Sequence, residues 1–366
     1  MSPTAVPTSR TEEFDAPLAE LTTMRVGGPA ARLVTVTTTD ELVDAVREVD
    51  DADEPLLVLS GGSNLVIGDE GFPGTVVRIA TSGIAQESAD HCGGAMVRVA
   101  AGEVWDDVVA RAVVEGWAGI EALSGIPGLA GATPVQNVGA YGQDVSQTIA
   151  SVRVWDRQEQ SVRTIANADC AFTYRHSLFK GTDRYVVLDV LFQFEIADLC
   201  RPIAYADLAR QLGVEQGDRV PLADAREAVL AQRRRRGMVL DESDHDTWSC
   251  GSFFTNPILS PEHFADLAHA AANRLGPDGP VPPQFPEPDG RIKTSAAWLI
   301  DKAGFVKGHG MPGPAALSTK HTLAVTNRGG ASAAQVADLA REVRDGVAQA
   351  FGVTLVNEPV FVGHSL

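Results

Sequence analysis

The sequence has 366 residues, of which 44% are hydrophobic and 21% are charged, and its formal net charge is −18. A chain of this length exceeds one ordinary hydrophobic core, so two or three domains are expected. The acidic balance argues against non-specific binding to nucleic acid, and an anionic substrate would need basic residues gathered locally.

In chain order, the first part of the sequence mixes many strands with few helices, which indicates an α+β fold. Strands are predicted at 33–37, 56–59, 75–79, 96–100, 151–155 and 185–194, and helices at 40–49, 103–115 and 221–236. Gly116 stands where a C-terminal cap of the second helix belongs. The strand at 185–194 carries Asp189 and Gln193 on one face, so its sheet is expected to be fully covered on the other side only.

A second unit is expected from about Met238 onward. Its predicted helices begin after the N-cap pair Ser260-Pro261, span about 295–303, and run from the capping box Ser332–Gln335 to about 351. A loop rich in proline and glycine is expected at 276–290, and a strand at 353–356 is expected to close the chain.

Two further features exclude other classes of protein. No apolar run is long enough to span a membrane, and residues 1–17, expected to be a short polar tail, lack the apolar core of a signal peptide. The cysteines show neither CxxC nor Cys/His spacing, so they indicate reduced, mostly buried thiols rather than a zinc site or redox pair: Cys92, Cys170, Cys200 and Cys250.

The segment 124–142, SGIPGLAGATPVQNVGAYG, is the main candidate for a ligand site. Its glycines and prolines exclude a regular helix or strand, and they allow main-chain N–H groups to approach a planar or anionic ligand. A solvent loop is the alternative, but such loops are usually charged, and this segment has no charged residue. A buried loop must find partners for its polar groups, which favours a ligand-lining role.

A second glycine turn, Ser60-Gly61-Gly62-Ser63-Asn64, directly follows a predicted strand. It is not a GxxxxGK[ST] loop, and no GxGxxG motif opens a helix, so a Rossmann dinucleotide site is not indicated. The turn either cradles a phosphate or is only a tight turn. Together with 124–142 it suggests one extended ligand held at two places.

Three single residues have two interpretations each. Arg175 is either a surface charge or an anion ligand. Ser252, between Gly251 and two aromatic residues, lacks the GxSxG context of a nucleophile and is more typical of a strand start. Glu358, in an apolar stretch, needs a partner that is either functional or a structural ion pair. The arginine run 233–236 is either a solvated helix end or an anion site.

Taken together, several segments resemble the family of UDP-N-acetylenolpyruvoylglucosamine reductases, also called UDP-N-acetylmuramate dehydrogenases, and in particular its longer, type I branch. The resemblance covers about 21–363 and includes TMRVGG (23–28), the GGSN turn, 124–142, Tyr174-Arg175, GSFFTNP (251–257), AAWLIDKAG (296–304) and NEPVFVG (357–363). Each motif is weak alone, but their order and spacing are specific.

The resemblance implies an α+β fold with a two-part FAD-binding domain of the vanillyl-alcohol-oxidase type and a smaller α+β substrate-binding domain. It implies a flexible tail at 1–18, a first FAD subdomain at 19–80 completed by 351–366, a second at 81–237, and the substrate domain at 238–350. It also implies a cytoplasmic monomer with no metal, acting in peptidoglycan precursor synthesis.

The resemblance further implies a chemistry. Non-covalent FAD would lie between the GGSN turn and 124–142, with the NVGAYG end nearest the reaction. NADPH would reduce the flavin, and hydride would then reach the vinyl carbon of UDP-N-acetylglucosamine enolpyruvate, giving UDP-N-acetylmuramate. Arg175 would hold the carboxylate and enolate oxygens, Ser252 would donate the proton, and Glu358 would hydrogen-bond the enolate.

Binding residues follow from the same motifs. The residues implied for FAD are Arg25, Gly61, Gly62, Ser63, Asn64, Ser124, Gly125, Ile126, Pro127, Gly128, Gly131, Gln136, Asn137, Gly139, Ala140 and Tyr141. The residues implied for the substrate are Tyr174, Tyr205, Arg236 and Asn256. Two positions depart from the family: Arg236 stands where many members carry lysine, and Thr255 where some relatives carry lysine.

Two other functions are compatible with parts of the pattern. One is an FAD oxidase or dehydrogenase of the same fold that acts on an alcohol or sugar, which leaves GSFF and NEPVFVG without roles. The other is a catalytically silent flavin or nucleotide-sugar binding protein, which the presence of Arg175, Ser252 and Glu358 disfavours.

Overall fold

The computed structural model describes residues 10–90 and 92–366. The chain forms two compact units, each assembled from separate stretches of sequence. Among the described residues, the first contains 10–16, 30–62, 72–90 and 92–235, and the second contains 17–29, 63–71 and 236–366. In this grouping, residues 63–71 belong with the C-terminal part of the chain.

The described residues of the first unit form three sheets, one of which is the two-stranded pair β9–β10, and four α-helices. The strands of the sheet β1-β2-β5-β3 are β1 (Thr11–Pro17), β2 (Pro29–Val36), β3 (Leu56–Leu59) and β5 (Phe72–Ile79). The other strands are β6 (Ile84–Asp90), β7 (Gly94–Ala100), β8 (Trp117–Ala118), β9 (Gly139–Ala140), β10 (Gln143–Asp144), β11 (Ile149–Asp156), β12 (Ser161–Ala166) and β13 (Tyr185–Ile196). The helices are α1 (Thr39–Asp51), α2 (Trp105–Val114), α3 (Ala206–Leu212) and α4 (Leu222–Arg235).

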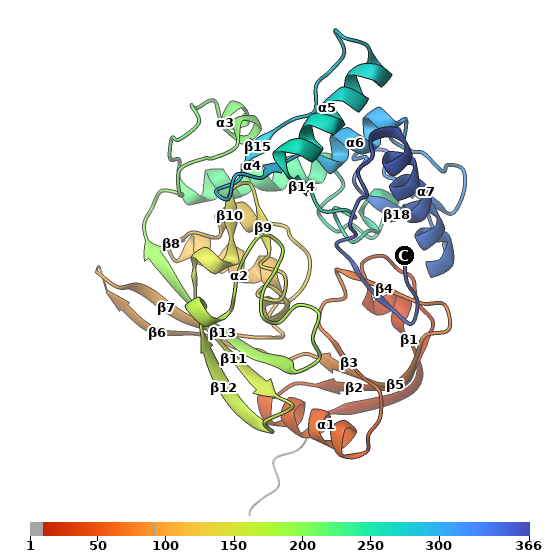
Figure 1. Ribbon diagram of the computed structural model, residues 1–366. Helices are drawn as coiled ribbons and strands as arrows, with labels where there is room; N and C mark the ends of the chain where they lie inside the picture. The colour runs from red at the N-terminus through yellow and green to blue at the C-terminus, as the bar shows by residue number, and fades with distance from the viewer. Residues whose placement is uncertain (1–9, 91) are drawn as a thin grey trace, which may run out of the picture. The chain divides into compact units, whose positions relative to one another are not determined.

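The larger sheet has the order β12-β11-β13-β7-β6, with β8 also paired to β13, and its central pairings are antiparallel (Figure 1). Gln193 of β13 is exposed, as expected for the open face of the strand, whereas Asp189 on the same face is only 3% exposed. Arg98 of β7 and Arg153 of β11 pair with its carboxylate at 2.7 and 2.5 Å. A buried carboxylate is tolerated in a sheet when arginines on both neighbouring strands neutralise it.

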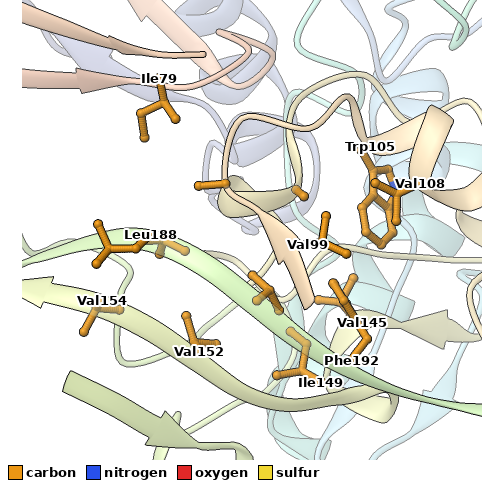
Figure 2. Packing of buried hydrophobic residues seen from close by; sticks show 14 of the residues in the cluster. Ile79, Val99, Trp105, Val108, Val145, Ile149, Val152, Val154, Leu188 and Phe192 are labelled. Atoms are coloured by element: carbon orange, nitrogen blue, oxygen red, sulfur yellow. The ribbon is translucent and has the colours of Figure 1, made fainter. Parts of the chain in front are cut away.

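The main core of the first unit lies between this sheet and α2. Trp105 of α2 is fully buried, and its ring centroid lies 5.9 Å from that of Phe192. Figure 2 shows Val108 of the same helix beside Trp105, with Val99 and Phe192 of the sheet nearby. The helical spacing of apolar residues in α2 thus reflects its burial on the sheet, and Gly116 has the positive φ of +71° expected after the helix end.

The N-terminal segment differs from the expected flexible tail. Thr11–Pro17 forms β1, the edge strand next to β2. Arg10 pairs with Glu12 at 2.6 Å and with Glu48 of α1 at 2.8 Å, and Arg32 pairs with the same two carboxylates. Residues 1–9 of the predicted tail lie outside the described residues. This segment has no alternating apolar pattern that would predict a strand, because only Ala16 within β1 is buried.

The second unit contains three α-helices and several short strands. The helices are α5 (Pro261–Leu275), α6 (Ala296–Ala303) and α7 (Ala333–Phe351), and the strands are β4 (Leu65–Ile67), β14 (Ile258–Leu259), β15 (Phe285–Pro286), β16 (Ile292–Lys293), β17 (Ala315–Leu317), β18 (Val325–Asn327) and β19 (Val360–Val362). The predicted caps are confirmed: the Ser260 hydroxyl accepts from the His263 N–H, and Ser332 and Gln335 form a capping box. No helix among the described residues is both long and apolar enough to cross a membrane.

The C-terminal strand lies later than expected. Residues 353–356 have no regular structure, and the strand is Val360–Val362, which pairs in parallel with β4 at 65–67. Val353 and Leu355 are buried against the core of the second unit, while Thr354 and Val356 are exposed. The alternation that predicts a strand at 353–356 therefore reflects the packing of an extended segment without a partner ladder.

Candidate functional site

The loop 124–142 lies within the first unit and is largely irregular, as predicted; a short 3-10 turn at Ala130–Ala132 and the two-residue β9 interrupt it. Main-chain bonds hold it at several points. The Gly125 N–H donates to the Asp106 carboxylate at 2.6 Å, and the Trp105 N–H donates to the Gly128 carbonyl at 3.0 Å. α2 thus anchors the SGIPG end, and part of the loop's polar backbone is satisfied by the fold itself.

The two glycine segments approach each other inside the first unit. A Cβ placed on Gly61 would lie 2.7 Å from the Gly128 Cα, so only glycine at position 61 allows the two backbones to be this close. The Ser60 hydroxyl beside this contact is buried and has no hydrogen-bond partner within the described part of the chain. A bare backbone cradle with an unsatisfied buried hydroxyl fits a flat, phosphate-bearing group such as FAD.

Arg175 lies in a tight turn of the first unit. The Thr173 and His176 backbones bond to each other in both directions at 3.0 and 3.2 Å, and Arg175 has φ +55°. Its Nη2 donates to the Gly139 carbonyl at 2.9 Å, and its guanidinium lies 5.5 Å from the Tyr174 ring centroid. The NVGAYG end of the loop therefore lies beside one of the three expected catalytic residues.

Left-handed backbone is concentrated at predicted site residues. Arg25, Asn137, Tyr141 and Arg175 have φ between +47° and +56°, a conformation that is unfavourable for residues other than glycine. Asn137 is fixed by its side chain, which donates to the Thr173 carbonyl and accepts from the Ser146 N–H, both at 3.1 Å. Such strain persists where the surroundings enforce it, and it clusters at functional sites.

Tyr205 and Tyr141 lie close together in the first unit. Their ring centroids are 5.8 Å apart in an edge-to-face arrangement, and Tyr205 remains 52% exposed. Tyr205 is the residue before α3, and a cavity of about 170 Å³ nearby is lined by Tyr141, Gln143 and Arg201, among others. Tyr205, which the resemblance implies for substrate binding, is thus an exposed residue at the start of a short helix.

The second unit brings Asn64, Ser252 and Glu358 together. The Asn64 side-chain amide donates to the Glu358 carbonyl at 3.1 Å, and the Glu358 N–H donates to the carbonyl of Phe253, next to Ser252, at 2.8 Å. Burial, together with the charge of Glu358, raises the pKa of the Cys250 thiol to about 12. Two of the three expected catalytic residues are therefore neighbours on paired segments, 251–257 and 357–363.

Two further predicted residues are held by the second unit. The Arg25 Nη2 lies 3.1 Å from the Glu242 carboxylate, and the Asn327 amide donates to the Arg25 carbonyl at 3.0 Å. The Asn256 side-chain oxygen accepts from the Ala296 N–H at 3.0 Å, at the start of α6. This contact uses the amide oxygen of Asn256 and orients its NH₂ group.

A basic group also lies in the second unit. Arg236 is exposed, and its charge acts on His321 together with that of Lys307. Burial, reinforced by these two positive charges, lowers the pKa of His321 to about 4. The imidazole is therefore neutral near pH 7, and Arg236 belongs to a local basic group in a strongly acidic protein.

The predicted site residues divide between the two units. The first holds Gly61, Gly62, Ser124, Gly125, Ile126, Pro127, Gly128, Gly131, Gln136, Asn137, Gly139, Ala140, Tyr141, Tyr174, Arg175 and Tyr205. The second holds Arg25, Ser63, Asn64, Arg236, Ser252, Asn256 and Glu358.

Sequence reasoning missed two groups near these residues. Glu121 is 1% exposed and hydrogen-bonds to the segments that carry Tyr141 and Tyr205. Its place in the apolar stretch WAGIEAL is the same signal that singles out Glu358, namely a carboxylate that needs a partner. Lys307 and His321 had no comparable signal, because their proximity to Arg236 exists only in the folded chain.

Two family models match the chain. One, described as an FAD binding domain, matches residues 30–165, and the other, described as the C-terminal domain of UDP-N-acetylenolpyruvoylglucosamine reductase, matches residues 242–362. The first match includes the GGSN turn and 124–142, and the second includes Ser252, Asn256 and Glu358.

Curated relatives match over nearly the whole chain. The UDP-N-acetylenolpyruvoylglucosamine reductase of Thermobifida fusca is 59% identical over 96% of this chain and 98% of its own. That of Streptomyces avermitilis is 61% identical, with 97% and 96% covered.

Solved structures with lower identity share the fold. UDP-N-acetylenolpyruvylglucosamine reductase from Thermus caldophilus has a TM-score of 0.63 at 24% identity, covering 97% of this chain and 99% of its own. 6-Hydroxy-D-nicotine oxidase from Arthrobacter nicotinovorans has a TM-score of 0.51 at 19% identity, covering 96% and 88%. Together with the FAD-binding match, these likenesses confirm the expected α+β fold of the vanillyl-alcohol-oxidase type.

Proposed function

Because the chain belongs to the family of UDP-N-acetylenolpyruvoylglucosamine reductases, we propose that it reduces UDP-N-acetylglucosamine enolpyruvate to UDP-N-acetylmuramate with NADPH and FAD. The single observation that carries the proposal is the 59% identity to a named reductase over 96% of the chain. The match to the C-terminal family model, residues 242–362, covers GSFF and all but the last residue of NEPVFVG, two motifs that an oxidase of the same fold would leave unused.

The first unit supplies the cofactor site. When bound, FAD supplies two-electron chemistry, through which a hydride from NADPH reaches the vinyl carbon of the substrate. The bare backbone at Gly61 and Gly128 would hold the cofactor, and the buried Ser60 hydroxyl would offer it a hydrogen bond. The NVGAYG end carries no acidic or basic residue, so its role is to position the cofactor.

Arg175 stabilises charge in this mechanism. Hydride addition to the vinyl carbon leaves an enolate whose negative charge spreads over the substrate's carboxylate oxygens. A guanidinium stays charged at all relevant pH values and binds two such oxygens in a fork. The bond to the Gly139 carbonyl and the contact with Tyr174 fix the direction of the Arg175 side chain before substrate arrives.

Ser252 and Glu358 complete the addition. The carbon next to the new C–H bond takes a proton, and the Ser252 hydroxyl donates it. A hydroxyl is a weak acid near pH 7, but an enolate carbon is basic enough to accept from it. Glu358, held next to this segment through the Phe253 carbonyl, hydrogen-bonds to the enolate as a protonated carboxyl group or through a bridging water.

Four residues bind the nucleotide-sugar in this proposal. Tyr205 covers the substrate, Tyr174 contacts it beside Arg175, Asn256 donates from its oriented NH₂ group, and Arg236 contacts the diphosphate. The charge near Arg236 supports this assignment, because the net charge of −18 otherwise repels an anion. Of these four residues, only Asn256 lies within the proposed substrate domain, 238–350.

Replacing Ser252 tests the chemistry. In Ser252→Ala we expect NADPH to reduce the bound flavin at the wild-type rate, while reoxidation by the enolpyruvyl nucleotide-sugar slows by about 10²–10⁴-fold. Stopped-flow absorbance of the flavin measures both half-reactions separately. Ser243→Ala, an exposed serine in the same unit, is the control and should leave both unchanged.

Two outcomes contradict the proposal. Normal reoxidation of Ser252→Ala would remove this residue from the mechanism. If wild-type protein oxidises NADPH only with oxygen, or oxidises an alcohol or sugar, the oxidase function is correct instead. A purified protein that is colourless and cannot be reconstituted with FAD excludes both flavoenzyme functions.

A further inference from the structure

Glu121 is a buried carboxylate that the proposed chemistry does not use. It is 1% exposed, and it lies in the 3-10 turn Glu121–Leu123 just before the glycine loop. One oxygen accepts from the Gly119 N–H at 2.6 Å. The other accepts from the Gln143 side-chain amide and from the Arg201 N–H, both at 2.8 Å.

These bonds connect two segments that are far apart in sequence. Gln143 belongs to β10, which pairs with β9 so that Gln143 lies opposite Ala140, and Tyr141 is in the turn between these strands. Gln143 is itself fixed, because its side-chain oxygen accepts from the Ala122 N–H at 2.9 Å. Arg201 begins the short stretch that leads to Tyr205. One carboxylate thus holds the base of the Tyr141 hairpin and the base of the Tyr205 segment.

The two segments also touch at their far ends. A Cβ on Gly142 would lie 2.6 Å from the Ala204 Cβ, so the hairpin turn and the residue before Tyr205 are in direct contact. The Tyr141 and Tyr205 rings meet edge to face beyond that contact. Between the two ends lies the cavity of about 170 Å³, which Glu121, Gln143 and Ile203 line. Open space there means that packing alone does not fix the spacing, and the carboxylate bonds do.

We propose that Glu121 is a positioning residue that sets the place of Tyr205 relative to Tyr141, and thereby the affinity for the nucleotide-sugar. This inference rests on the proposed function, in which Tyr205 covers the substrate. Three donors converge on Glu121, and only a carboxylate offers acceptors to all of them. Glutamine in its place puts an NH₂ group against the Gly119 N–H and leaves only an uncharged oxygen for Gln143 and Arg201. One bond is then lost, and the two bonds that connect the segments lose their charge assistance.

The test is the change Glu121→Gln, combined with Tyr205→Ala. We expect Glu121→Gln to raise the KM and the dissociation constant for the nucleotide-sugar by about 10-fold, the loss of one buried charge-assisted hydrogen bond. Flavin reduction by NADPH should stay at the wild-type rate. In a Tyr205→Ala background the same change should have little further effect, because residues that act as one unit are not additive. Glu103→Gln is the control, since Glu103 also accepts from a main-chain N–H, that of Gly83, away from the hairpin.

Each result decides the inference. It is overturned if Glu121→Gln leaves substrate affinity unchanged, or if it lowers affinity equally with and without Tyr205. Should Glu121→Gln fail to fold, Gln143→Ala removes only one of the three bonds, and it must show a smaller effect with the same dependence on Tyr205. Wild-type protein that does not bind or reduce the nucleotide-sugar at all would instead refute the proposed function, so the two failures are distinct.

Discussion

Single residues at the site have backbone conformations that their side chains do not favour. Arg25, Asn137, Tyr141 and Arg175 each cost about 1 kcal/mol or more relative to an ordinary conformation. The cost is met by specific bonds, such as those of the Asn137 side chain to two neighbouring segments. A prediction for a single residue therefore concerns the charge or hydrogen bond that its side chain supplies in this fixed position.

Replacing Arg175 with lysine keeps the charge and removes the fork. We expect Arg175→Lys to slow flavin reoxidation by substrate by about 10²-fold, because one ammonium cannot hold two developing oxygens in the geometry of a guanidinium. Flavin reduction by NADPH should be unaffected, and stopped-flow absorbance measures both rates. Arg111→Lys, at an exposed helical position paired with Glu115, is the matched control. Equal slowing of both half-reactions would instead indicate that Arg175 maintains the cofactor site.

The neutral His321 predicts a pH dependence of stability. Its pKa is about 4 in the folded protein and about 6.5 in an unfolded chain, so the unfolded state binds more protons between these values. The contribution to stability is therefore complete above about pH 6.5 and is lost as the pH falls toward 4. We expect His321→Gln to flatten this loss by the order of 2 kcal/mol between about pH 7.5 and 4.5. Urea unfolding of both proteins at the two pH values measures it, and parallel curves would contradict it.

At the scale of elements, the site depends on close approaches between loops. Gly61 lies against Gly128, and a Cβ on Gly131 would lie 2.5 Å from the Ala101 Cβ at the end of β7. The glycine loop is thus packed on the sheet and on the GGSN turn, with no room for side chains at these points. Its irregular path is fixed by contacts rather than by a repeating ladder.

Gly61→Ala tests this packing. Position 61 does not have a positive φ, so the added methyl group acts only through space. We expect the two backbones to separate and FAD affinity to fall by about 10-fold or more, consistent with the 1–3 kcal/mol typical of overpacking. Reconstitution of the apoprotein followed by flavin fluorescence measures the affinity. Gly93→Ala is the control, because its methyl group meets only the Asp90 side chain. Unchanged FAD affinity in Gly61→Ala would place the cofactor elsewhere.

Much of this element level is predictable from the sequence. The caps of α5 and α7 are confirmed, because a helix terminus is specified by residues next to it. β1 and the position of the last strand are not predictable, since each is defined by a distant partner and has little apolar pattern of its own. The burial of Asp189 is not predictable for the same reason, because the two arginines that neutralise its carboxylate come from other strands.

The site residues are predictable to a different extent. The two glycine loops can be identified as candidate ligand sites from composition alone. So many glycines are needed only where the backbone takes an irregular path or approaches another group closely. The roles expected for Arg175, Ser252 and Glu358 depend on the family resemblance, since a lone arginine or serine has ordinary alternatives. Glu121 could have been found by the argument applied to Glu358, because both are carboxylates in apolar stretches. The group around His321 could not have been found from the sequence, because its residues come together only in the folded chain.

At the scale of the whole molecule, each unit is assembled from segments that are far apart in the sequence. The chain passes repeatedly between the two units, and the second unit is built from 17–29, 63–71 and 236–366. Met24, Val26 and Val66 from the two early segments are buried in the same core as α5, α6 and α7. The first 235 residues therefore contain pieces that have no core of their own.

A chain ending at Arg235 tests this interdependence. We expect it to be cleaved readily within 63–71 by a non-specific protease, because β4 lacks β19 and Val66 lacks its buried surroundings. The full chain under the same conditions is the control and should be protected there. A shortened chain that resists cleavage at 63–71 would show that this segment is held without the C-terminal part.

The parallel pair β4–β19 also has a consequence for synthesis on the ribosome. Asn64 and Glu358, which it holds together, are 294 positions apart. At about 5–20 residues per second, translation takes about 15–60 s to proceed from one to the other. During that time residues 63–71 have left the ribosome and still await their partner strand. The GGSN turn, which continues directly into this segment, therefore acquires its final surroundings only in the last moments of synthesis.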